Sequence, residues 1–591
     1  MSSQRNLEYL TLGIFAAGIA LLYLVLRGNY LLGALVLAGI YAIVVLGIVL
    51  LSGLSGQYTL GHAAFFGIGA YASALTSLAD VPVPAACLLA TVSTAVFAIV
   101  IGVSILRLKG YYLALATLAF GLIVFSLLNG WHNLTMGPSG LGGIPKFQVA
   151  GLVFKSEDAY YWLVWTIAFF TVWGSINLWR SRLGQALLAV KRDEDGAAAV
   201  GINVAWVKLQ VFALSAALAG LGGALYAHYI TFIAPERFNM VASFELLLAA
   251  LLGGIGTPFG AVFGALLLVA LPEVVVLLRD YKVIVYGVVF ILVSLYLPRG
   301  LAGLITLSLA GPRPRFAETG LAPIATATPR CKYEEPSPIL EALNVGKSFA
   351  GLVALSNISF AVDIRTVHGV VGPNGAGKTT LFNIITSVFP PSSGEVRFEG
   401  TRISGLPAYR VARLGVARTF QNVRLFGDQT VLENVVIGAY RNTRAGLMAG
   451  ALRFPSAVAE ELQVRSEAIE CLRFVGLAAD AQRKAEILPF GQQRLLEFAR
   501  ALALRPKLLL LDEPAAGLND NETEQLAQLI SQLPARGITV LLVEHNMGLM
   551  MSVADRIVVL NYGSKIAEGD PDEIQDNREV VKAYLGEPAD A

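Results

Sequence analysis

About ten apolar stretches, each close to the length of a membrane-crossing helix, follow one another before residue 300. They cover residues 9–26, 30–51, 60–78, 83–106, 111–128, 160–179, 211–230, 244–255, 259–278 and 283–297. Since roughly 20 apolar residues cross a bilayer as a helix, most of them are long enough, and 244–255 is the short one. No small-residue cleavage site follows the first stretch, which is typical of an anchor rather than a signal peptide. The pattern predicts a polytopic all-α membrane domain of about ten transmembrane helices.

The charged residues are concentrated in the other half of the chain. Hydrophobic residues make up 55% of the sequence and charged residues 15%. Lys and Arg total 44 and Asp and Glu 42, yet only about 26 of these lie before residue 311. Residues 311–336 are rich in Pro, Ala and Thr, which is typical of an extended linker. We therefore expect a membrane domain at 1–310, a linker at 311–336 and a soluble domain at 337–591.

Two further features of the composition narrow the possible functions. The net charge of +2 gives no reason to expect a nucleic-acid partner. Cys87, Cys331 and Cys471 are scattered and lack the spacing of metal ligands, so no disulfide framework or cysteine metal site is expected.

Basic residues mark alternate loops of the membrane domain. They are Arg107, Lys109, Arg180, Arg182, Lys191 and Arg192. Because Lys and Arg are enriched in cytoplasmic loops, these loops should face the cytoplasm, and residues 130–158 should face outward. Glu245 and Glu273 could line a substrate path, although a place at helix ends is the simpler explanation. His62, His132 and His228 are interpreted as structural.

The soluble half contains a complete P-loop between a strand-like segment, VHGVV, and a helical one beginning LFNII. Its residues are Gly372, Pro373, Asn374, Gly375, Ala376, Gly377, Lys378, Thr379 and Thr380. The glycines let backbone amides turn inward around phosphates, and the following helix adds its positive end. Lys378 should neutralise the β- and γ-phosphates of ATP, and Thr379 should offer its hydroxyl to Mg²⁺.

Acidic residues follow an apolar strand further along the chain. Residues 508–511 are four leucines, typical of a buried parallel strand, and Asp512 at their end is predicted to hold Mg²⁺ through water. Glu513 is the candidate general base for the attacking water. His545, at the exit of a second apolar strand, is predicted to contact the γ-phosphate, although a lone histidine there could also be structural.

The ordered set GPNGAGKTT, RTFQN, LPFGQQ, LLLLDEP and VEH resembles that of an ABC ATPase over essentially all of 337–591. The resemblance implies an α/β P-loop ATPase fold. It makes Gln421 the Q-loop residue that senses the γ-phosphate and Mg²⁺ and touches the membrane domain. It also makes Phe349 the aromatic that stacks on adenine, and it places Asn519 in the D-loop, where many relatives have Asp.

The signature motif of this family, usually LSGGQ, reads LPFGQ here, with Pro489 in the place of the serine. Proline is favoured at the first position of a helix, where its missing N–H would have no partner, and we expect Pro489 there. Gly491 and Gln492 remain, with the free amides and positive end of the helix that attract phosphate. One lost hydrogen bond to a charged group costs about 1.5–3 kcal/mol, so the predicted motor still works.

The loop 180–209 lies between two membrane spans and is charged and alanine-rich. One interpretation is a solvated cytoplasmic loop. The other is a short helix at about 193–200 that docks onto an ATPase and ends at Gly201, which can adopt the left-handed conformation. ABC importers carry such a coupling helix with an E-A-A…G pattern, which Glu194, Ala197, Ala198 and Gly201 match imperfectly.

Segments 53–71, 107–121, 134–145 and 180–227 resemble the branched-chain amino acid permease family over nearly all of 1–305, although Met136 replaces a usual glycine. The C-terminal sequence resembles the partner ATPase of that system. The chain is thus similar to a fusion of the two subunits of an importer in a bacterial inner membrane, with the ATPase in the cytoplasm. The resemblance implies ATP and Mg²⁺ as cofactors.

A single ATPase domain cannot close a nucleotide site in this family, because the P-loop of one copy meets the signature of another. The resemblance implies a second permease and a second ATPase, surrounding lipid, and a soluble protein outside that delivers a small-molecule substrate. A homodimer of the fusion is the alternative. Urea, amides or aromatic acids as substrates, a non-transporting ATP-gated membrane protein and an exporter also remain open.

Overall fold

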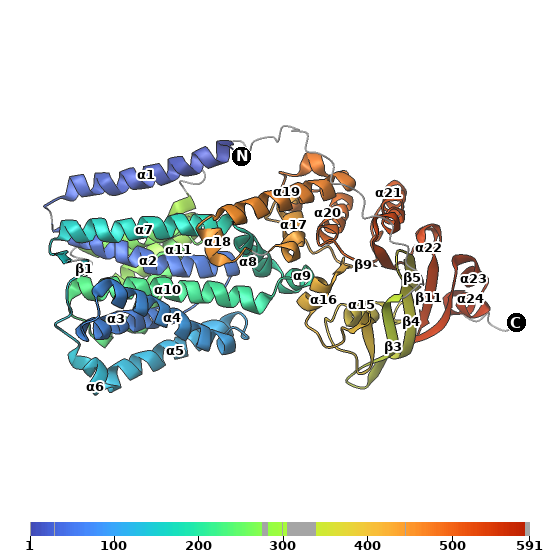
Figure 1. Ribbon diagram of the computed structural model, residues 1–591, viewed down its shortest axis with the longest axis horizontal. Coiled ribbons are helices and arrows are strands. Elements are labelled where there is room, and N and C mark those ends of the chain that lie inside the picture. Colours follow the sequence, from blue (N-terminus) through green and yellow to red (C-terminus); the bar gives the residue numbers. More distant parts are fainter. Residues whose placement is uncertain are drawn as a thin grey trace. The chain divides into compact units, whose positions relative to one another are not determined.

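The computed structural model describes residues 2–28, 30–149, 151–274, 282–297, 300–303, 338–443 and 445–585. The chain forms two compact units (Figure 1). Unit 1 comprises Met1–Lys191, Ala205–Arg315 and Gly446–Phe454, and unit 2 comprises Arg192–Val204, Phe316–Ala445 and Pro455–Ala591. The linker expected at 311–336 lies outside the described residues.

Unit 1 is built mainly of helices, and each apolar stretch that the sequence marks coincides over most of its described residues with one of them (Figure 1). They are α1 (Ser2–Leu26), α2 (Leu31–Ser55), α3 (His62–Leu78), α4 (Val83–Ile105), α5 (Tyr111–Gly130), α7 (Glu157–Arg180), α10 (Val204–Ile230), α11 (Met240–Gly253), α12 (Phe259–Val274) and α13 (Lys282–Tyr296). The shorter elements are α6 (His132–Thr135), η1 (Gly137–Ser139), the hairpin β1 (Gln148–Val149) and β2 (Leu152–Val153), α8 (Arg182–Arg192), η2 (Pro235–Phe238) and α18 (Leu447–Ala451).

Five helices of the described part of the chain are long and apolar enough to cross a membrane. They are α2, α4, α5, α7 and α10. Leu10–Leu26, Met240–Gly253 and Phe259–Val269 are shorter apolar helices. The membrane domain therefore has several candidate spans, and the expected number of about ten includes helices that are shorter than a full crossing.

The burial of these helices shows which one forms the core of unit 1. Every residue of α2 from Ala42 to Ser55 is buried, and α2 packs against α7, α11 and α12. On α4 the buried stripe consists mainly of small residues, which include Ala86, Ala90 and Ala98, whereas most of the large apolar residues are exposed. A soluble helix exposes its polar face, so an exposed face rich in Leu and Val is typical of contact with lipid.

Small residues also let two helices of unit 1 approach at their backbones. A Cβ atom added at Gly69 of α3 would lie 2.3 Å from the Cα atom of Gly220 of α10. One added at Gly223 would lie 2.1 Å from the carbonyl oxygen of Phe66. Glycine is required at this crossing because no side chain fits there.

Two of the histidines interpreted as structural are buried and hydrogen-bonded inside unit 1. His228 Nε2 lies 2.8 Å from Ser73 Oγ, and His228 Nδ1 lies 2.7 Å from the carbonyl oxygen of Pro145. His62 Nε2 lies 3.4 Å from Ser215 Oγ. These contacts join helices to each other or to the loop that contains Pro145, which supports the structural interpretation of His62 and His228.

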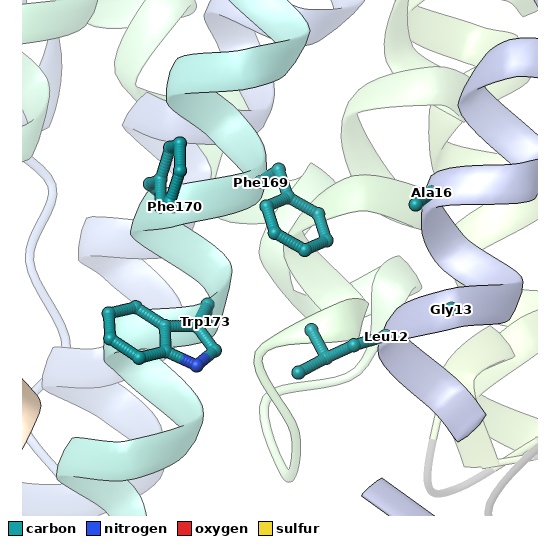
Figure 2. A pocket seen from close by; sticks show the side chains of 6 residues that line it. All are labelled: Leu12, Gly13, Ala16, Phe169, Phe170 and Trp173. Atoms are coloured by element: carbon teal, nitrogen blue, oxygen red, sulfur yellow. The ribbon is translucent and has the colours of Figure 1, made fainter. Parts of the chain in front are cut away.

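A hollow of about 340 Å³ lies between α1 and α7 (Figure 2). It is lined by Leu12, Gly13, Ala16, Phe169, Phe170 and Trp173. A small polar solute needs a few well-placed polar groups to fix its orientation, and this lining is almost entirely apolar. The hollow is therefore not a candidate site for an amino acid.

The described residues of unit 2 form two sheets. The first has six strands in the order β12-β11-β5-β10-β9-β8, in which only the β11–β12 pair is antiparallel. The strands are β5 (Val367–Val371), β8 (Val416–Arg418), β9 (Leu508–Asp512), β10 (Thr539–Val543), β11 (Arg556–Asn561) and β12 (Ser564–Gly569). The second sheet is antiparallel in the order β4-β3-β6-β7, formed by β3 (Pro338–Phe349), β4 (Leu352–Asp363), β6 (Ser393–Phe398) and β7 (Thr401–Arg402).

The α-helices of unit 2 fall into two sets: some pack against the six-stranded sheet, and others pack mainly against other helices (Figure 1). They are α9 (Glu194–Ala199), α15 (Lys378–Ile385), α16 (Ala408–Leu414), α17 (Val431–Gly438), α19 (Pro455–Phe474), α20 (Phe490–Ala503), α21 (Asp520–Ser531), α22 (Met547–Val553), α23 (Pro571–Gln575) and α24 (Arg578–Leu585). Helices α17, α19 and α20 pack against one another.

The four-leucine strand β9 is buried on both faces, as the sequence predicts. Leu509 and Leu511 belong to the hydrophobic core on the side of α19 and α20, whereas Leu508 and Leu510 belong to the core that includes α15 and the second sheet. Side chains alternate along a strand, so a continuous apolar run supplies both cores at once. The fold is the expected α/β arrangement with a parallel sheet.

Candidate functional site

The P-loop lies between β5 and α15, in the strand–loop–helix context that the sequence predicts. Gly372, Gly375 and Gly377 have φ angles of 154°, 82° and 99°. A Cβ atom at Gly372 would lie 2.2 Å from the carbonyl oxygen of Leu560, and one at Gly377 would lie 2.6 Å from Leu355. The loop therefore needs glycine for its backbone shape and its close packing, while Gly375 has open space around it.

Lys378 is the first residue of α15 and is buried. Its Nζ donates hydrogen bonds to the carbonyl oxygens of Gly372 at 2.7 Å and Pro373 at 3.1 Å, which places the ammonium inside the loop. Burial lowers the pKa of Lys378, and the charges of Glu513 and Asp512 oppose this shift. Thr379, the next residue, is exposed at the helix start, and Thr380 is half-buried.

Asp512 ends β9 and is fully buried. Its Oδ2 accepts a hydrogen bond of 2.7 Å from Arg418 Nη2, and its Oδ1 has no hydrogen-bond partner among the described residues. Burial raises the pKa of Asp512, and the neighbouring Arg418 guanidinium opposes this shift. Because Mg²⁺ prefers oxygen ligands, an unpartnered carboxylate oxygen at the strand end fits the expected metal site.

Arg418 was not expected from the sequence. It ends β8, the strand beside β9, and its Nη1 donates to Asn383 Oδ1 at 2.6 Å and to Thr386 Oγ1 at 3.1 Å. The side chain thus fixes Asp512 against α15. The only sequence signal was its position three residues before Gln421 in RTFQN.

The three candidate catalytic residues meet in the structure. Gln421 Nε2 donates to Glu513 Oε2 at 2.9 Å, and His545 Nε2 lies 3.1 Å from Glu513 Oε1. Glu513 has φ of 49°, a left-handed conformation that is strained for a residue with a side chain, and its amide donates to the carbonyl oxygen of Val543. These residues follow β8, β9 and β10, which are adjacent in the sheet, so their exits lie at one edge.

Glu544 is a second functional candidate that the sequence did not mark. The carboxylate is buried, and its Oε1 accepts a hydrogen bond of 2.7 Å from the amide of Ala515. Its Oε2 accepts from the amides of His545 at 3.0 Å and Asn546 at 3.4 Å. Burial raises the pKa of Glu544, and the three amides oppose this shift. Glu544 therefore holds the turn after Glu513 against the segment that carries His545.

Phe349 ends β3, in the hairpin that packs beside Gly377. Its ring is 42% exposed and lies edge-on to Phe389, with a centroid distance of 5.2 Å. Lys347 Nζ lies 5.0 Å from the centre of the Phe349 ring. The exposure and the neighbouring P-loop fit the expected adenine contact.

The signature segment begins α20, but the predicted position of Pro489 is wrong by one residue. Phe490 is the first helical residue, and Pro489 is the N-cap, with φ of −55° and ψ of 154° and no side-chain cap. The extended ψ is the conformation that an N-cap residue adopts, so the proline is accommodated before the first turn rather than within it. Gly491 is buried and Gln492 is half-buried within the first turn.

The start of α20 lies against the expected D-loop of the same unit, the segment from Gly517 to Asn519. A Cβ atom at Gly517 would lie 2.9 Å from the Phe490 ring, and one at Gly491 would lie 2.2 Å from Glu522 Oε1. Asn519, the expected D-loop residue, caps α21 together with Glu522. The aromatic residue of LPFGQ therefore packs on the glycine of the D-loop.

The helix predicted at about 193–200 is present as α9 and belongs to unit 2. Asp193 caps it, and Gly201 follows it with φ of 85°. The amide of Ile202 donates to the carbonyl oxygen of Ala197, a bond that closes the helix end. Within unit 2, Asp193 Oδ2 lies 3.1 Å from Arg424 Nη1, and Arg413 Nε donates to the carbonyl oxygen of Gly201 at 3.3 Å.

Three family profiles match the chain. Residues 30–294 match the branched-chain amino acid transport system permease component, residues 355–516 match the ABC transporter family, and residues 564–590 match a branched-chain amino acid ATP-binding cassette transporter segment.

Curated relatives match the ATP-binding half. The high-affinity branched-chain amino acid transport ATP-binding protein BraF of Pseudomonas aeruginosa is 45% identical over 251 residues, which are 42% of this chain and 98% of that protein. The LivG protein of Escherichia coli, described in the same words, is 41% identical over the same share of both chains. A solved nucleotide-free ATP-binding cassette from an ABC transporter is 32% identical, with 42% of this chain and 100% of that chain covered and a TM-score of 0.38.

The P-loop, the buried aspartate and the Glu513 cluster lie in the half that is similar to transport ATP-binding proteins, and the apolar helices lie in the half that matches the permease. The chain belongs to the branched-chain amino acid ABC transporter family and carries a permease and an ATP-hydrolysing subunit in one polypeptide.

Proposed function

We propose that this chain imports branched-chain amino acids or closely related small molecules, driven by ATP hydrolysis at the Glu513 cluster. The observation that carries the proposal is the meeting of Gln421, Glu513 and His545 at one edge of the sheet, in a chain whose other half is a permease. The relatives are named for branched-chain amino acids, which favours these substrates over urea, amides or aromatic acids.

In this proposal the P-loop residues Gly372–Thr380 hold the phosphates of ATP, and Phe349 stacks on adenine. Glu513 acts as the general base, His545 contacts the γ-phosphate, and Gln421 senses it. Thr379, Gln421 and Asp512 provide oxygen atoms for Mg²⁺, which neutralises charge on the phosphates. Gly491 and Gln492, at the start of α20, serve the nucleotide held by another ATPase domain.

The partners of the proposed importer are a second permease, a second ATPase and a soluble substrate-binding protein outside. A homodimer of the fused chain is the alternative arrangement. The proposed location is a bacterial inner membrane, with lipid around the apolar helices and the ATPase half in the cytoplasm.

The experiment is uptake into proteoliposomes that contain this chain, its partner subunits and the binding protein. Labelled leucine should accumulate when ATP is supplied to the cytoplasmic side, and the Glu513→Gln complex should accumulate none. Equal uptake by both complexes, or ATP hydrolysis without uptake of any branched-chain amino acid, would contradict the proposal.

A further inference from the structure

One face of the signature helix α20 buries three charged side chains, Arg494, Glu497 and Arg500, which we call the α20 charge cluster. They are spaced three residues apart, so they lie on the same side of the helix, and their exposed fractions are 8%, 1% and 2%. Arg500 Nη2 lies 3.3 Å from Glu497 Oε1, and Arg494 Nη1 lies 4.0 Å from Glu497 Oε2. Buried charges are costly unless they are paired and hydrogen-bonded, so their further partners show what they hold.

These further partners are backbone atoms of the loop 420–424, which contains the Q-loop residue. Arg494 donates to the carbonyl oxygens of Phe420 at 2.9 Å and Gln421 at 2.6 Å. Glu497 Oε1 accepts from the amides of Phe420 at 3.4 Å and Arg424 at 3.5 Å. Bonds to backbone atoms fix the course of a loop whatever its side chains are.

Arg500 completes the set by donating to the carbonyl oxygen of Arg424, while its guanidinium lies 5.2 Å from the centre of the Phe426 ring. The five backbone groups that the cluster holds thus bracket Gln421 on both sides. Glu497 is central because it neutralises Arg500 and also accepts from two loop amides. Burial raises the pKa of Glu497, and Arg500 and Arg494 oppose this shift.

The same loop reaches two other functional parts through its side chains. Gln421 Nε2 donates to Glu513 Oε2 beside the chain's own P-loop. Arg424 pairs with Asp193 at the start of α9. The loop 420–424 is therefore in contact with the carboxylate of Glu513, with α9 and with the signature helix α20.

We propose that the α20 charge cluster joins the Q-loop and the signature helix into one rigid body, with Glu497 as the positioning residue. This inference rests on the proposed function, in which the start of α20 closes on nucleotide bound by a second ATPase domain. A shift of Gln421 at the chain's own nucleotide then shifts α20 at the other nucleotide. The cluster thereby couples the two ATP sites of the complex.

The test uses Glu497→Gln in the full chain, with Glu470→Gln as the matched control. Glu470 pairs with Arg473 three residues later on α19, and both side chains are partly exposed, so the control removes a helix carboxylate that does not touch the Q-loop. Hydrogen exchange of the amides in 419–425 should be faster in Glu497→Gln and unchanged in the control. Unchanged exchange in Glu497→Gln would overturn the inference, and this readout does not depend on transport or on the partner subunits.

In the assembled complex, Glu497→Gln should leave the nucleotide affinity of this P-loop within about twofold of the parent's. The kcat of ATP hydrolysis should fall about tenfold, and the Hill coefficient of hydrolysis for ATP should be near 1. A merely structural role would instead lower the amount of folded protein without changing the Hill coefficient. Parental kcat and cooperativity in a complex that transports would overturn the inference and leave the proposed function intact.

Glu497→Asp provides a second variant in case Glu497→Gln does not fold. It keeps the negative charge beside Arg500 but withdraws the carboxylate from the loop amides by one methylene. We expect folding and ATP binding to persist, with faster exchange at 419–425 and a Hill coefficient between those of Glu497→Gln and the parent. Parental exchange and cooperativity in Glu497→Asp would also overturn the proposal.

Discussion

Glu513 is held in place by partners from two different segments, the loop after β8 and the end of β10. Gln421 and His545 contact its two carboxylate oxygens, and its strained backbone is fixed by the carbonyl oxygen of Val543. A carboxylate that is oriented in this way can take a proton from water without first reorganising. Substitutions of single residues should therefore distinguish the loss of the proton acceptor from the loss of ATP binding.

We expect Glu513→Gln to reduce ATP hydrolysis by about 10²–10⁴-fold while ATP affinity stays within a few-fold of the parent, because only the proton acceptor is removed. The amide of glutamine can still contact Gln421 and His545. Phosphate release by the complex and nucleotide binding by the isolated chain are the two measurements. Glu524→Gln, on the exposed side of α21, is the control and should hydrolyse ATP like the parent. Hydrolysis near the parental rate in Glu513→Gln would show that another group is the base.

Lys378→Ala should act on binding instead. The ammonium is fixed inside the P-loop by two carbonyl oxygens, so its removal takes away the positive charge that the phosphates meet. One hydrogen bond to a charged group is worth about 1.5–3 kcal/mol, which corresponds to a loss of roughly 10–150-fold in ATP affinity. Equilibrium binding of a fluorescent ATP analogue measures it, and unchanged affinity would count against the P-loop assignment.

At the scale of single residues, the motifs predict the proposed catalytic residues. They do not predict the residues that hold the catalytic side chains in place. Glu513 and His545 could be marked in the sequence because they follow apolar strands, and Gln421 could be marked through the resemblance of RTFQN to the ABC ATPase motif. Arg418, Glu544 and the α20 charge cluster could not be marked. Their roles depend on burial and on backbone partners far away in the sequence, and one sequence shows neither.

Among the elements, α20 shows how a small error in a helix boundary changes the physical argument. The sequence correctly predicts a helix at the signature and a proline that does not break it, but it places Pro489 inside the helix rather than at the N-cap. At the N-cap a serine would accept a hydrogen bond from an amide of the first turn. A serine in the place of Pro489 would therefore be positioned to cap α20.

Pro489→Ser should consequently change stability little and activity modestly. A new cap stabilises by about 1 kcal/mol, whereas removing a proline raises the entropy of the unfolded chain and costs about 0.4–1 kcal/mol. The recovered hydroxyl could raise transport up to about tenfold, which corresponds to one hydrogen bond of roughly 1.4 kcal/mol. Thermal unfolding and uptake check the two halves of this prediction. A loss of transport with unchanged unfolding would mean that the proline itself is needed.

Gly491→Asp should abolish transport while the P-loop of this chain still binds ATP. Its Cβ would meet the Glu522 carboxylate, which cannot move freely because it caps α21 with Asn519, and its own charge would repel phosphate. Gly491→Ala adds the Cβ without the charge and separates the two effects. Uptake and ATP binding are measured for both, and full transport by Gly491→Asp would mean that this signature does not act on nucleotide.

At the scale of the whole molecule, each of the two compact units contains a short segment from the other half of the sequence. Unit 2 contains residues 192–204 from the permease half, and unit 1 contains residues 446–454 from the ATPase half. In unit 1, Asn177 Nδ2 donates to the carbonyl oxygen of Ala451 at 3.0 Å. The sequence predicts the first segment from its alanines and Gly201, but 446–454 has no motif, so only packing reveals it.

The ion pair between Asp193 and Arg424 joins α9 to the loop that carries Gln421. Asp193→Asn keeps the helix cap, because asparagine accepts the same hydrogen bond from Asp195, but it removes the charge. Arg424→Gln removes the other charge. A partly exposed ion pair is worth about 0.2–1 kcal/mol, so folding should hardly change, while the uptake per ATP hydrolysed should fall about two- to fivefold in each variant.

The double variant decides whether the pair acts as a unit. If the two charges couple hydrolysis to uptake through each other, Asp193→Asn with Arg424→Gln should lower the uptake per ATP no further than either change alone. Asp195, which lies 3.6 Å from Arg424, provides the control, because Asp195→Asn leaves the closer partner in place and should cost less. Losses that multiply in the double variant would show that Asp193 and Arg424 act independently and that the coupling contact lies elsewhere on α9.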